Sequence, residues 1–250
     1  MNLRNKKILL TGATGGIGTA LVEQLTKEGA TILAHGRNAA KLDSLTAAYK
    51  NVVPLVGDLS SQEDLDMLLN AIETHDRDLD ILILNAGIQQ HIELASDLHG
   101  MEKTKHEMTV NALIPMQLSS ALLPLLLERD EAAVVGVTSL LAYAPKQSAP
   151  VYSASKAALK SFLQALGYQL EGTSVQVIEW IPPLVDTPMT EGRGTRKMTP
   201  EDCAARFTKS LLHSRRVCSP GVGRFIPALL RLAPGFIQKK IREPDSPTTI

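Results

Sequence analysis

The sequence predicts an α/β fold, in which helices cover both faces of a parallel sheet within a single domain. Short apolar runs alternate along the chain with longer stretches of helical period, which is the pattern of successive β-α-β units. The runs at 81–84 and 132–135 are apolar at consecutive positions, as expected of strands buried on both faces. No repeat, low-complexity segment or Pro/Gly-rich linker divides the 250 residues, so one core is expected.

The alternation places the individual elements. Strands are expected at the apolar runs 7–10, 31–34, 52–56, 81–84, 133–137 and 175–180. Helices are expected between them, at about 17–28, 38–49, 61–75, 101–127 and 152–171.

After about residue 186 the pattern loosens. The stretch 187–198, TPMTEGRGTRKM, has a polar, flexible composition and is interpreted as a mobile loop. A helix is expected from Thr199, because Pro200 suits the first helical position and the acidic Glu201 and Asp202 suit the helix dipole. The segment 225–250 is interpreted as a C-terminal helical extension. Prolines and a glycine break its apolar and basic part, which predicts two short helices there.

Composition excludes some functions and sets the expected compartment. Lys plus Arg and Asp plus Glu both number 26, so the formal net charge is zero and nothing calls for a nucleic-acid partner. Only three apolar residues follow the N-terminal charges, too few for a signal peptide, and no run approaches the roughly 20 apolar residues of a membrane span. A soluble cytoplasmic protein without a metal site is expected. In it Cys203 and Cys218 are expected as reduced thiols rather than a disulfide.

A glycine-rich turn, TGATGGIG at 11–18, joins the first expected strand to the first helix. Backbone N–H groups at a helix start can face an anion, and glycine lets a pyrophosphate approach the backbone without a Cβ in the way. A tight turn that binds no ligand is the alternative. The position of the loop after the first strand favours a dinucleotide.

A second motif, YSASK at 152–156, pairs a phenol with an ammonium group. Residues four apart share one face of a helix, so the two side chains can meet. A nearby positive charge favours phenolate and lowers the pKa of a tyrosine from its usual value of about 10. A surface Tyr and Lys on one helix flank is the alternative.

Together these motifs carry a resemblance. TGATGGIG, Asn85-Ala86-Gly87, Asn111, Ser139 and Tyr152-x-x-x-Lys156, in this order and spacing, resemble the short-chain dehydrogenase/reductase family over residues 1 to about 190. The length and the YSASK form favour its compact oxidoreductase branch over the longer epimerase and dehydratase branch. The resemblance implies a Rossmann-type, doubly wound parallel sheet in three layers, α/β/α.

The resemblance also implies catalytic roles. Ser139 would hydrogen-bond the substrate carbonyl or alcohol, and Tyr152 would give or take the hydroxyl proton as hydride moves to or from a nicotinamide. Lys156 would lower the pKa of Tyr152 and hold the nicotinamide ribose, and Asn111 would hold a water that links Lys156 to solvent. Donors placed in this way stabilise the charge that hydride transfer builds on oxygen. Taken singly, Ser139 and Asn111 could equally be a strand-end cap and a helix hydrogen bond.

A cofactor site follows from the same resemblance. Asp58 and Leu59 would contact the adenine, although Asp58 could instead cap the helix that begins near Ser61. The segment 85–87 would border the cofactor, unless it is a simple turn. The residues expected to bind the cofactor are Gly12, Thr14, Gly16, Ile17, Gly18, Arg37, Asn38, Asp58, Leu59, Asn85, Ala86, Gly87, Tyr152, Lys156, Val185 and Thr187.

The end of the second strand favours NADP over NAD. An acidic residue there would accept hydrogen bonds from the ribose 2′-OH of NAD, whereas an arginine would bind the 2′-phosphate of NADP. The sequence reads Ala34-His35-Gly36-Arg37-Asn38 and contains no acid, and Lys41 lies nearby. The alternative is a solvated arginine at a helix start, where it opposes the helix dipole.

Two features depart from the family pattern. The usual Pro-Gly after the sixth strand is Pro182-Pro183, and Pro183 fixes φ and cannot donate a hydrogen bond, so the backbone near Val185 and Thr187 can differ. The stretch SRRVCSPGVG could supply a seventh strand, but a further apolar and basic segment follows it. That segment puts the family's common tetramer interface in question, although a homodimer or homotetramer is still expected.

Apolar residues surround the expected mouth of the site. If these apolar residues converge, they form an apolar pocket that the segment 187–198 covers as a lid. The expected substrate is then a hydrophobic carbonyl or alcohol compound. The alternative is ordinary core packing. The tail is expected to pack on the domain or a partner rather than on a membrane surface. The residues concerned are Leu140, Leu141, Tyr143, Leu184, Val185, Met189 and Met198.

Three classes of function follow. The first is an NADP(H)-dependent oxidoreductase that interconverts a carbonyl and a secondary alcohol, with the tyrosine as acid and base. The second is a cofactor-binding sensor or scaffold on the same fold. The third is an epimerase or dehydratase that keeps its nicotinamide bound. The complete Ser, Tyr and Lys set and the short chain favour the first.

Overall fold

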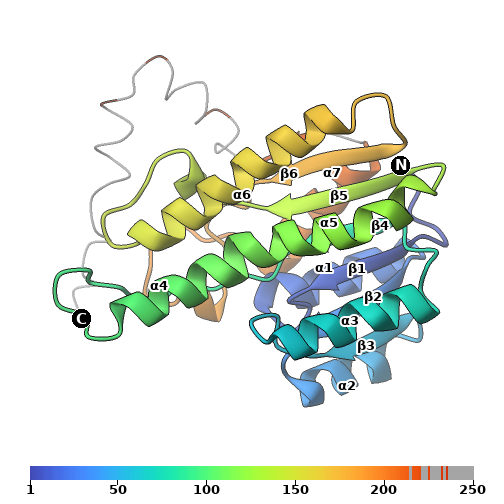
Figure 1. Ribbon diagram of the computed structural model, residues 1–250, viewed down its shortest axis with the longest axis horizontal. Helices are drawn as coiled ribbons and strands as arrows, with labels where there is room; N and C mark the ends of the chain where they lie inside the picture. Colours follow the sequence, from blue (N-terminus) through green and yellow to red (C-terminus); the bar gives the residue numbers. More distant parts are fainter. Residues whose placement is uncertain (214–215, 221–224, 226–231, 233–234, 236–250) are drawn as a thin grey trace.

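Seven parallel strands form a single sheet in the computed structural model (Figure 1), which describes residues 1–213, 216–220, 225, 232 and 235. The spatial order is β3-β2-β1-β4-β5-β6-β7, so the chain reverses its direction of travel across the sheet between β1 and β4. Ligands of such sheets bind at this reversal, beside the carboxyl ends of the strands. The strands are β1 (Lys7–Thr11), β2 (Thr31–Gly36), β3 (Val52–Val56), β4 (Ile81–Leu84), β5 (Ala132–Val137), β6 (Val175–Trp180) and β7 (Val217–Cys218).

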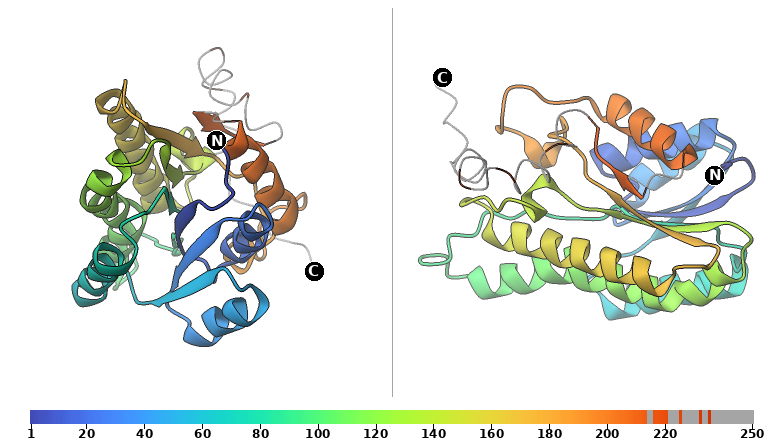
Figure 2. Two further views of the ribbon diagram at one scale, coloured as in Figure 1. Left: turned by 90° about the vertical axis from the view of Figure 1, so that its right-hand side faces the viewer. Right: turned by 90° about the horizontal axis from the view of Figure 1, so that it is seen from above.

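Helices lie on both faces of the sheet (Figure 2), and the two faces have separate apolar cores. One core joins the sheet to α1 (Gly16–Lys27), α2 (Ala39–Ala48) and α7 (Pro200–Leu212). The other joins it to α3 (Gln62–His75), α5 (Ile114–Leu127) and α6 (Pro150–Gln169). The prediction of a doubly wound α/β/α domain is confirmed.

The expected elements agree with the observed ones to within two residues at each boundary, with one exception. The helix expected at 101–127 consists of α4 (Gly100–Met108), a π-helical turn (Thr109–Leu113) and α5. A π-turn inserts an extra residue and redirects the side chains on it, and such turns are frequent at functional sites. Asn111 lies in this turn.

The continuous helix Gly100–Leu127 is long and apolar enough to span a membrane by composition, with a mean hydropathy of 1.6. Over half of that window is buried inside the protein, and Leu118, Leu122 and Leu126 belong to the core beneath the sheet. The helix is therefore apolar because it is a core helix.

The C-terminal elements follow the predicted signals. The hydroxyl of Thr199 accepts a hydrogen bond from the Asp202 amide at 3.1 Å and caps α7. Phe207 of α7 stacks on Trp180 of β6 with ring centroids 4.3 Å apart, and β7 adds the seventh strand beside β6. Cys203 and Cys218 are both buried and are not joined in a disulfide. The two short helices expected after residue 225 lie outside the described residues, apart from Phe225, Leu232 and Gly235.

Candidate active site

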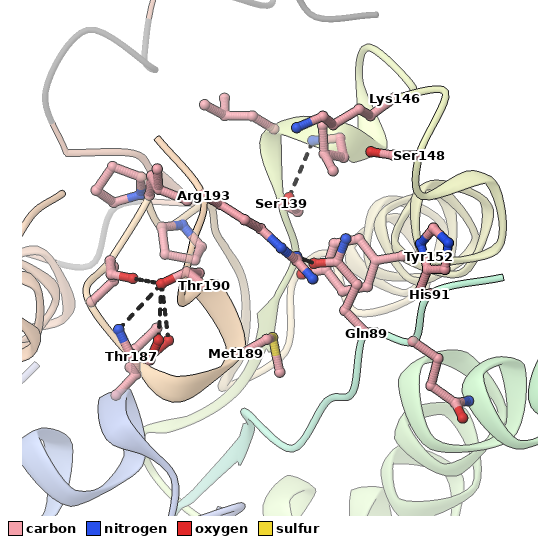
Figure 3. A pocket seen from close by; sticks show the side chains of 18 residues that line it. Gln89, His91, Ser139, Lys146, Ser148, Tyr152, Thr187, Met189, Thr190 and Arg193 are labelled. Atoms are coloured by element: carbon pink, nitrogen blue, oxygen red, sulfur yellow. Dashed lines mark hydrogen bonds between the residues drawn. The ribbon is translucent and has the colours of Figure 1, made fainter. Parts of the chain in front are cut away.

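Two adjoining cavities lie at the carboxyl edge of the sheet. The large cleft, of about 660 Å³, follows the glycine-rich turn and the ends of β2, β4 and β5. The small pocket, of about 480 Å³, lies between the loop after β4, the turn after β5 and the segment after β6 (Figure 3). Both are lined by Ile17, Tyr152, Pro182, Thr187 and Met189.

The glycine-rich turn forms the floor of the large cleft, and two of its glycines are required by close approaches. Gly12 has a φ of +67°, and a Cβ there would lie 2.9 Å from the Cα of Ala86. A Cβ on Gly18 would lie 2.1 Å from the carbonyl oxygen of Gly12. At Gly12 and Gly18, therefore, no side chain separates the backbone of the turn from the large cleft.

Two residues hold this turn against β4, and one of them was not predicted. The side-chain amide of Asn85 donates to the carbonyls of Thr11 and Gly12 at 2.9 and 3.2 Å. The hydroxyl of Thr11 accepts from the backbone amides of Asn85 and Ala86, both at 3.0 Å. Asn85 lines the cleft as expected, while its amide fixes the backbone of the turn. Thr11 stands in the quoted motif, but only the fold shows its partner 74 residues away.

The far end of the large cleft carries the predicted basic residues. Arg37, Asn38 and Lys41 line it, and the guanidinium of Arg37 lies 3.7 Å from the carboxylate of Asp58. Asn38 caps α2 by accepting from the Lys41 amide at 2.9 Å. This end combines two cations with one carboxylate.

Asp58 does not cap α3, because Ser61 occupies the cap position. Asp58 accepts instead from the amide and hydroxyl of Ser60 at 2.9 and 2.8 Å. Burial acts to raise the pKa of Asp58, but the Ser60 hydrogen bonds and the charge of Arg37 outweigh it and lower that pKa. Asp58 therefore lines the cleft as an ionised group.

His35 was not predicted to belong to the site. It lines the large cleft and is 3% exposed, and neither ring nitrogen has a hydrogen-bond partner among the described residues. Burial lowers the pKa of His35 to about 4, so the imidazole is neutral at pH 7.

The residues of the large cleft fit a dinucleotide. At the start of α1, the backbone N–H groups of glycines can approach phosphates closely, since no side chain covers them. At the β2 end lie the cations Arg37 and Lys41 and the ring of His35, whose nitrogens have no partner among the described residues. Tyr152 and Lys156 lie at the opposite end of the same cleft. Of the residues predicted to bind the cofactor, all line the cleft except Val185, which is 2% exposed and lines the small pocket.

The expected catalytic side chains meet where the two cavities join. Tyr152 lies in the first turn of α6 and borders both cavities, and Ser139 follows β5 and borders the small pocket. Lys156, one turn beyond Tyr152, is 3% exposed. Its ammonium lies 5.9 Å from the centroid of the Tyr152 ring and donates to the carbonyl of Val137 at 2.9 Å.

The ionisation of this group differs from the prediction. Burial raises the pKa of Tyr152 to about 12; the negative charge of Glu107 adds to this shift, whereas a hydrogen bond with Ser139 opposes it. Burial likewise lowers the pKa of Lys156 to about 8, against the charge of Glu107. The pKa of Tyr152 is therefore raised rather than lowered, because the loss of water around the phenol outweighs the opposing contributions. The role of Lys156 in lowering that pKa stays a prediction.

Asn111 lies behind the cavities and lines neither of them. Its side chain is fully buried, accepts from the Ile88 amide and donates to the Ile88 carbonyl, both at 2.8 Å, and donates to the hydroxyl of Ser155 at 3.1 Å. A Cβ on Gly87 would lie 3.2 Å from both the Asn111 oxygen and the Lys156 nitrogen. Asn111 and Lys156 thus converge on Gly87, and the predicted water between them stays a prediction.

Glu107 is a second unpredicted residue in this region. It is fully buried one helical turn before Asn111, and one of its oxygens accepts from the Gln90 amide at 3.0 Å. Its other oxygen has no partner among the described residues. Burial raises the pKa of Glu107, and the positive charges of Lys156 and Arg193 oppose that shift.

The small pocket is only partly the apolar pocket that the sequence predicts. Leu140, Leu141, Leu184, Val185 and Met189 line it, but Tyr143 and Met198 do not. The hydroxyl of Tyr143 donates to Glu179 at 2.7 Å, and Met198 packs against the core. The wall also carries polar residues that were not predicted: Gln89, Gln90, His91, Lys146, Ser148, Thr190 and Arg193.

The backbone near the two prolines makes contacts that the sequence does not show. The amide of Thr187 donates to the hydroxyl of Thr190 at 3.2 Å, and a short 3-10 helix, Pro188–Thr190, follows. A Cβ on Gly16 would lie 2.7 Å from the methyl group of Thr187, so this segment approaches the glycine-rich turn. Thr187 therefore lies at the border of both cavities, and its contact with a cofactor stays a prediction.

Comparison with known proteins agrees with this geometry. The family model described as short chain dehydrogenase matches residues 6–197. The uncharacterized oxidoreductase DltE of Bacillus subtilis (strain 168) is 35% identical over 191 residues, which are 76% of each chain. The uncharacterized oxidoreductase SERP2049 of Staphylococcus epidermidis is 31% identical over 198 residues, covering 78% of this chain and 85% of that one.

Two solved structures show the same fold at lower identity. A short chain dehydrogenase from Burkholderia cenocepacia J2315 in complex with NADP has a TM-score of 0.85 and 24% identity, over 98% of this chain and 100% of that chain. A short-chain dehydrogenase from Sphingobium yanoikuyae in complex with NADPH has a TM-score of 0.82 and 22% identity, over 98% and 99%. With the sheet, the glycine-rich turn and the Ser-Tyr-Lys group in place, the chain belongs to the short-chain dehydrogenase family of oxidoreductases.

Proposed function

We propose that this protein is an NADP(H)-dependent oxidoreductase that interconverts a carbonyl and a secondary alcohol, with Tyr152 as the acid and base. The observation that carries the proposal is the position of Tyr152 at the junction of the two cavities. Ser139 borders the junction from the small pocket and Lys156 from the large cleft. A substrate in the small pocket would thus meet a proton donor beside the nucleotide site.

The chain's own residues account for the proton and the charge. A nicotinamide bound in the large cleft would supply or accept the hydride. In the reducing direction the hydroxyls of Ser139 and Tyr152 would both donate to the carbonyl oxygen and stabilise the charge that builds on it. With its pKa raised to about 12, Tyr152 holds its proton at pH 7 and releases it only to a strongly basic oxygen such as the forming alkoxide.

NADP is proposed over NAD from the charges at the end of β2. Arg37 and Lys41 line the cleft there, where these cations would bind a 2′-phosphate, and the carboxylate of Asp58 is paired with Arg37. The structures from B. cenocepacia and S. yanoikuyae contain NADP and NADPH, which supports the proposal, whereas a related one from Burkholderia phymatum contains NAD.

Consumption of NADPH with a panel of aldehydes and ketones tests the proposal, with Tyr152→Phe as the diagnostic variant. We expect turnover by the wild type and a loss of about a hundred- to ten-thousandfold in kcat in the variant, because the proton donor is removed. The affinity for NADPH, measured by fluorescence titration, should stay within a few-fold.

Three results would contradict the proposal. Full turnover by a folded Tyr152→Phe protein would exclude Tyr152 as the acid. NADPH binding without reduction of any panel member would favour a sensor or scaffold. A purified protein that retains non-exchanging nicotinamide would favour an epimerase or dehydratase. The cytoplasmic location and the homo-oligomer stay predictions.

A further inference from the structure

The segment 184–198 closes into a loop whose two ends are tied together. Val185 bridges Met198 in parallel, the Asp186 amide donates to the Met198 carbonyl at 2.9 Å, and the Met198 amide donates to the Leu184 carbonyl at 2.9 Å. Lys197 adds an ion pair to Asp186 at 3.1 Å. The base of the loop is therefore held, and its tip is placed over the small pocket.

The tip carries an arginine between two glycines of left-handed conformation. Gly192 and Gly194 have φ values of +72° and +59°, which other residues adopt only with strain. Arg193 between them extends across the small pocket toward Gln89 and Tyr152 (Figure 3). Its guanidinium donates to the side-chain oxygen of Gln89, a residue 104 positions earlier in the sequence.

The described lining of the small pocket includes basic side chains and no carboxylate. Arg193 and Lys146 line it, His91 lines it as well, and no carboxylate stands among its described lining residues. The buried Glu107 lies behind Gln90 and feels the charge of Arg193, but it does not reach the wall. Glu179 is occupied by the hydroxyls of Thr138 and Tyr143. Arg193 therefore faces the cavity bound only to the neutral Gln89 among the described residues.

The oxygen that Arg193 now binds resembles the oxygen of a carboxylate. Gln89 offers a planar, neutral amide oxygen, and a carboxylate offers two oxygens of the same geometry with a negative charge. A guanidinium binds a carboxylate in bidentate fashion, which is stronger than its bond to a neutral amide. A carboxylate that enters the pocket would therefore replace Gln89 on Arg193.

We infer that the substrate is a carbonyl compound, or the matching alcohol, that carries a carboxylate, and that Arg193 binds this carboxylate while Tyr152 faces the carbonyl. The apolar side chains of Leu140, Leu141 and Met189 hold the hydrocarbon part. This inference rests on the proposed oxidoreductase function and specifies the substrate class of its pocket. It also refines the hydrophobic substrate that the sequence predicts, since only part of the wall is apolar.

Matched acid and ester substrates test the inference. Phenylglyoxylate and benzoylpropionate, which differ in the spacing of carbonyl and carboxylate, are compared with their methyl esters in NADPH-dependent reduction. We expect Arg193→Gln to lower the acid-to-ester ratio of kcat/KM by about ten- to a hundredfold, mainly through the KM of the acid. Arg196→Gln is the matched control, because Arg196 lies exposed on the same segment and lines neither cavity.

A binding experiment makes the test independent of turnover. Isothermal titration calorimetry compares mandelate with the neutral mandelamide on wild type and on Arg193→Gln. We expect mandelate to bind more tightly than mandelamide only while Arg193 is present, with the thermal unfolding midpoint unchanged by the substitution.

The outcomes separate the two proposals. An acid-to-ester ratio and a mandelate affinity that are the same in wild type and Arg193→Gln would overturn the carboxylate site, whether or not the esters are reduced. Arg193-dependent binding of mandelate without reduction of any carbonyl would support the site and contradict the oxidoreductase. Reduction of the esters with no preference for either acid would leave the oxidoreductase and refute the site.

Discussion

The large cleft and the small pocket share a border but are built in different ways. The cleft consists largely of backbone at the ends of β1, β2 and β4, where glycines at 12 and 18 permit close approach. The pocket consists of side chains from loops that follow β4, β5 and β6. The sheet determines the shape of the large cleft, whereas the length and sequence of the loops determine the shape of the small pocket. Membership of the family therefore predicts the residues of the cleft better than those of the pocket.

The two regions also differ in how their charges are balanced. In the cleft, Arg37 is paired with Asp58 at 3.7 Å, and Lys156 is buried and bonded to a backbone carbonyl. In the pocket, Arg193 binds only the neutral Gln89 among the described residues. The cleft thus pairs or buries its cations before a ligand binds, whereas the pocket presents a cation held only by a neutral group.

After Tyr152→Phe, the next largest expected effect also lies at the border of the two regions. Ser139→Ala should lower kcat by about a hundred- to a thousandfold, because one of two donors to the carbonyl oxygen is lost. Steady-state kinetics with the best panel substrate measure it, and the affinity for NADPH should not change, since Ser139 does not line the cleft. A loss in NADPH affinity equal to the loss in kcat would contradict the assignment of Ser139 to the substrate pocket rather than to the nucleotide cleft.

A charge reversal in the cleft tests its far end. Arg37→Asp should shift the NADPH-to-NADH ratio of kcat/KM toward NADH by about ten- to a hundredfold, because the acid repels a 2′-phosphate and accepts from a ribose hydroxyl. Lys50→Asp makes the same change of charge at an exposed position outside the cleft. Equal shifts in both variants would show a general charge effect instead of a binding site.

The pH dependence of reduction tests the buried lysine. Burial lowers the pKa of Lys156 to about 8, so above that pH the ammonium loses its proton, while Tyr152, with a pKa of about 12, keeps its own. We expect kcat/KM for reduction to be constant below pH 8 and to fall by about tenfold per unit above it. Lys156→Arg should keep the charge and remove this fall. A wild-type kcat/KM that stays constant up to pH 10 would contradict a role in reduction for the protonated Lys156.

The smallest effect is expected at the tip of the loop. Gly194→Ala combines a left-handed φ with a Cβ that would lie 2.5 Å from the end of the Leu184 side chain, so the loop tip or Leu184 must shift and KM for the substrate should rise about severalfold. Gly172→Ala is the control, because Gly172 has a φ of +83° and open space around it, far from both cavities in the sequence. A similar KM in the two variants would mean that the position of Arg193 does not limit substrate binding.

Much of the cleft could be predicted, whereas the pocket could be predicted only in its apolar part. The turn at 11–18 and the pair Tyr152 and Lys156 are local patterns, and local spacing determines which backbone groups and side chains lie together. The pairing of Arg193 with Gln89 joins residues 104 positions apart, and nothing in either neighbourhood signals it. The Gly-Arg-Gly triplet at 192–194 is a sign of a tight turn that presents Arg193, although it does not identify Gln89 as the partner.

By itself, the sequence determined the order of strands and helices, the glycine-rich turn and the positions of Ser139, Tyr152 and Lys156 along the chain. These follow from hydrophobic periodicity and from spacing within single elements. The tertiary structure alone decided which charges share a cavity and how far burial shifts the pKa values of Tyr152 and Lys156. The reason is that desolvation and Coulomb interactions sum over every element packed around a group, and those elements come from distant parts of the chain.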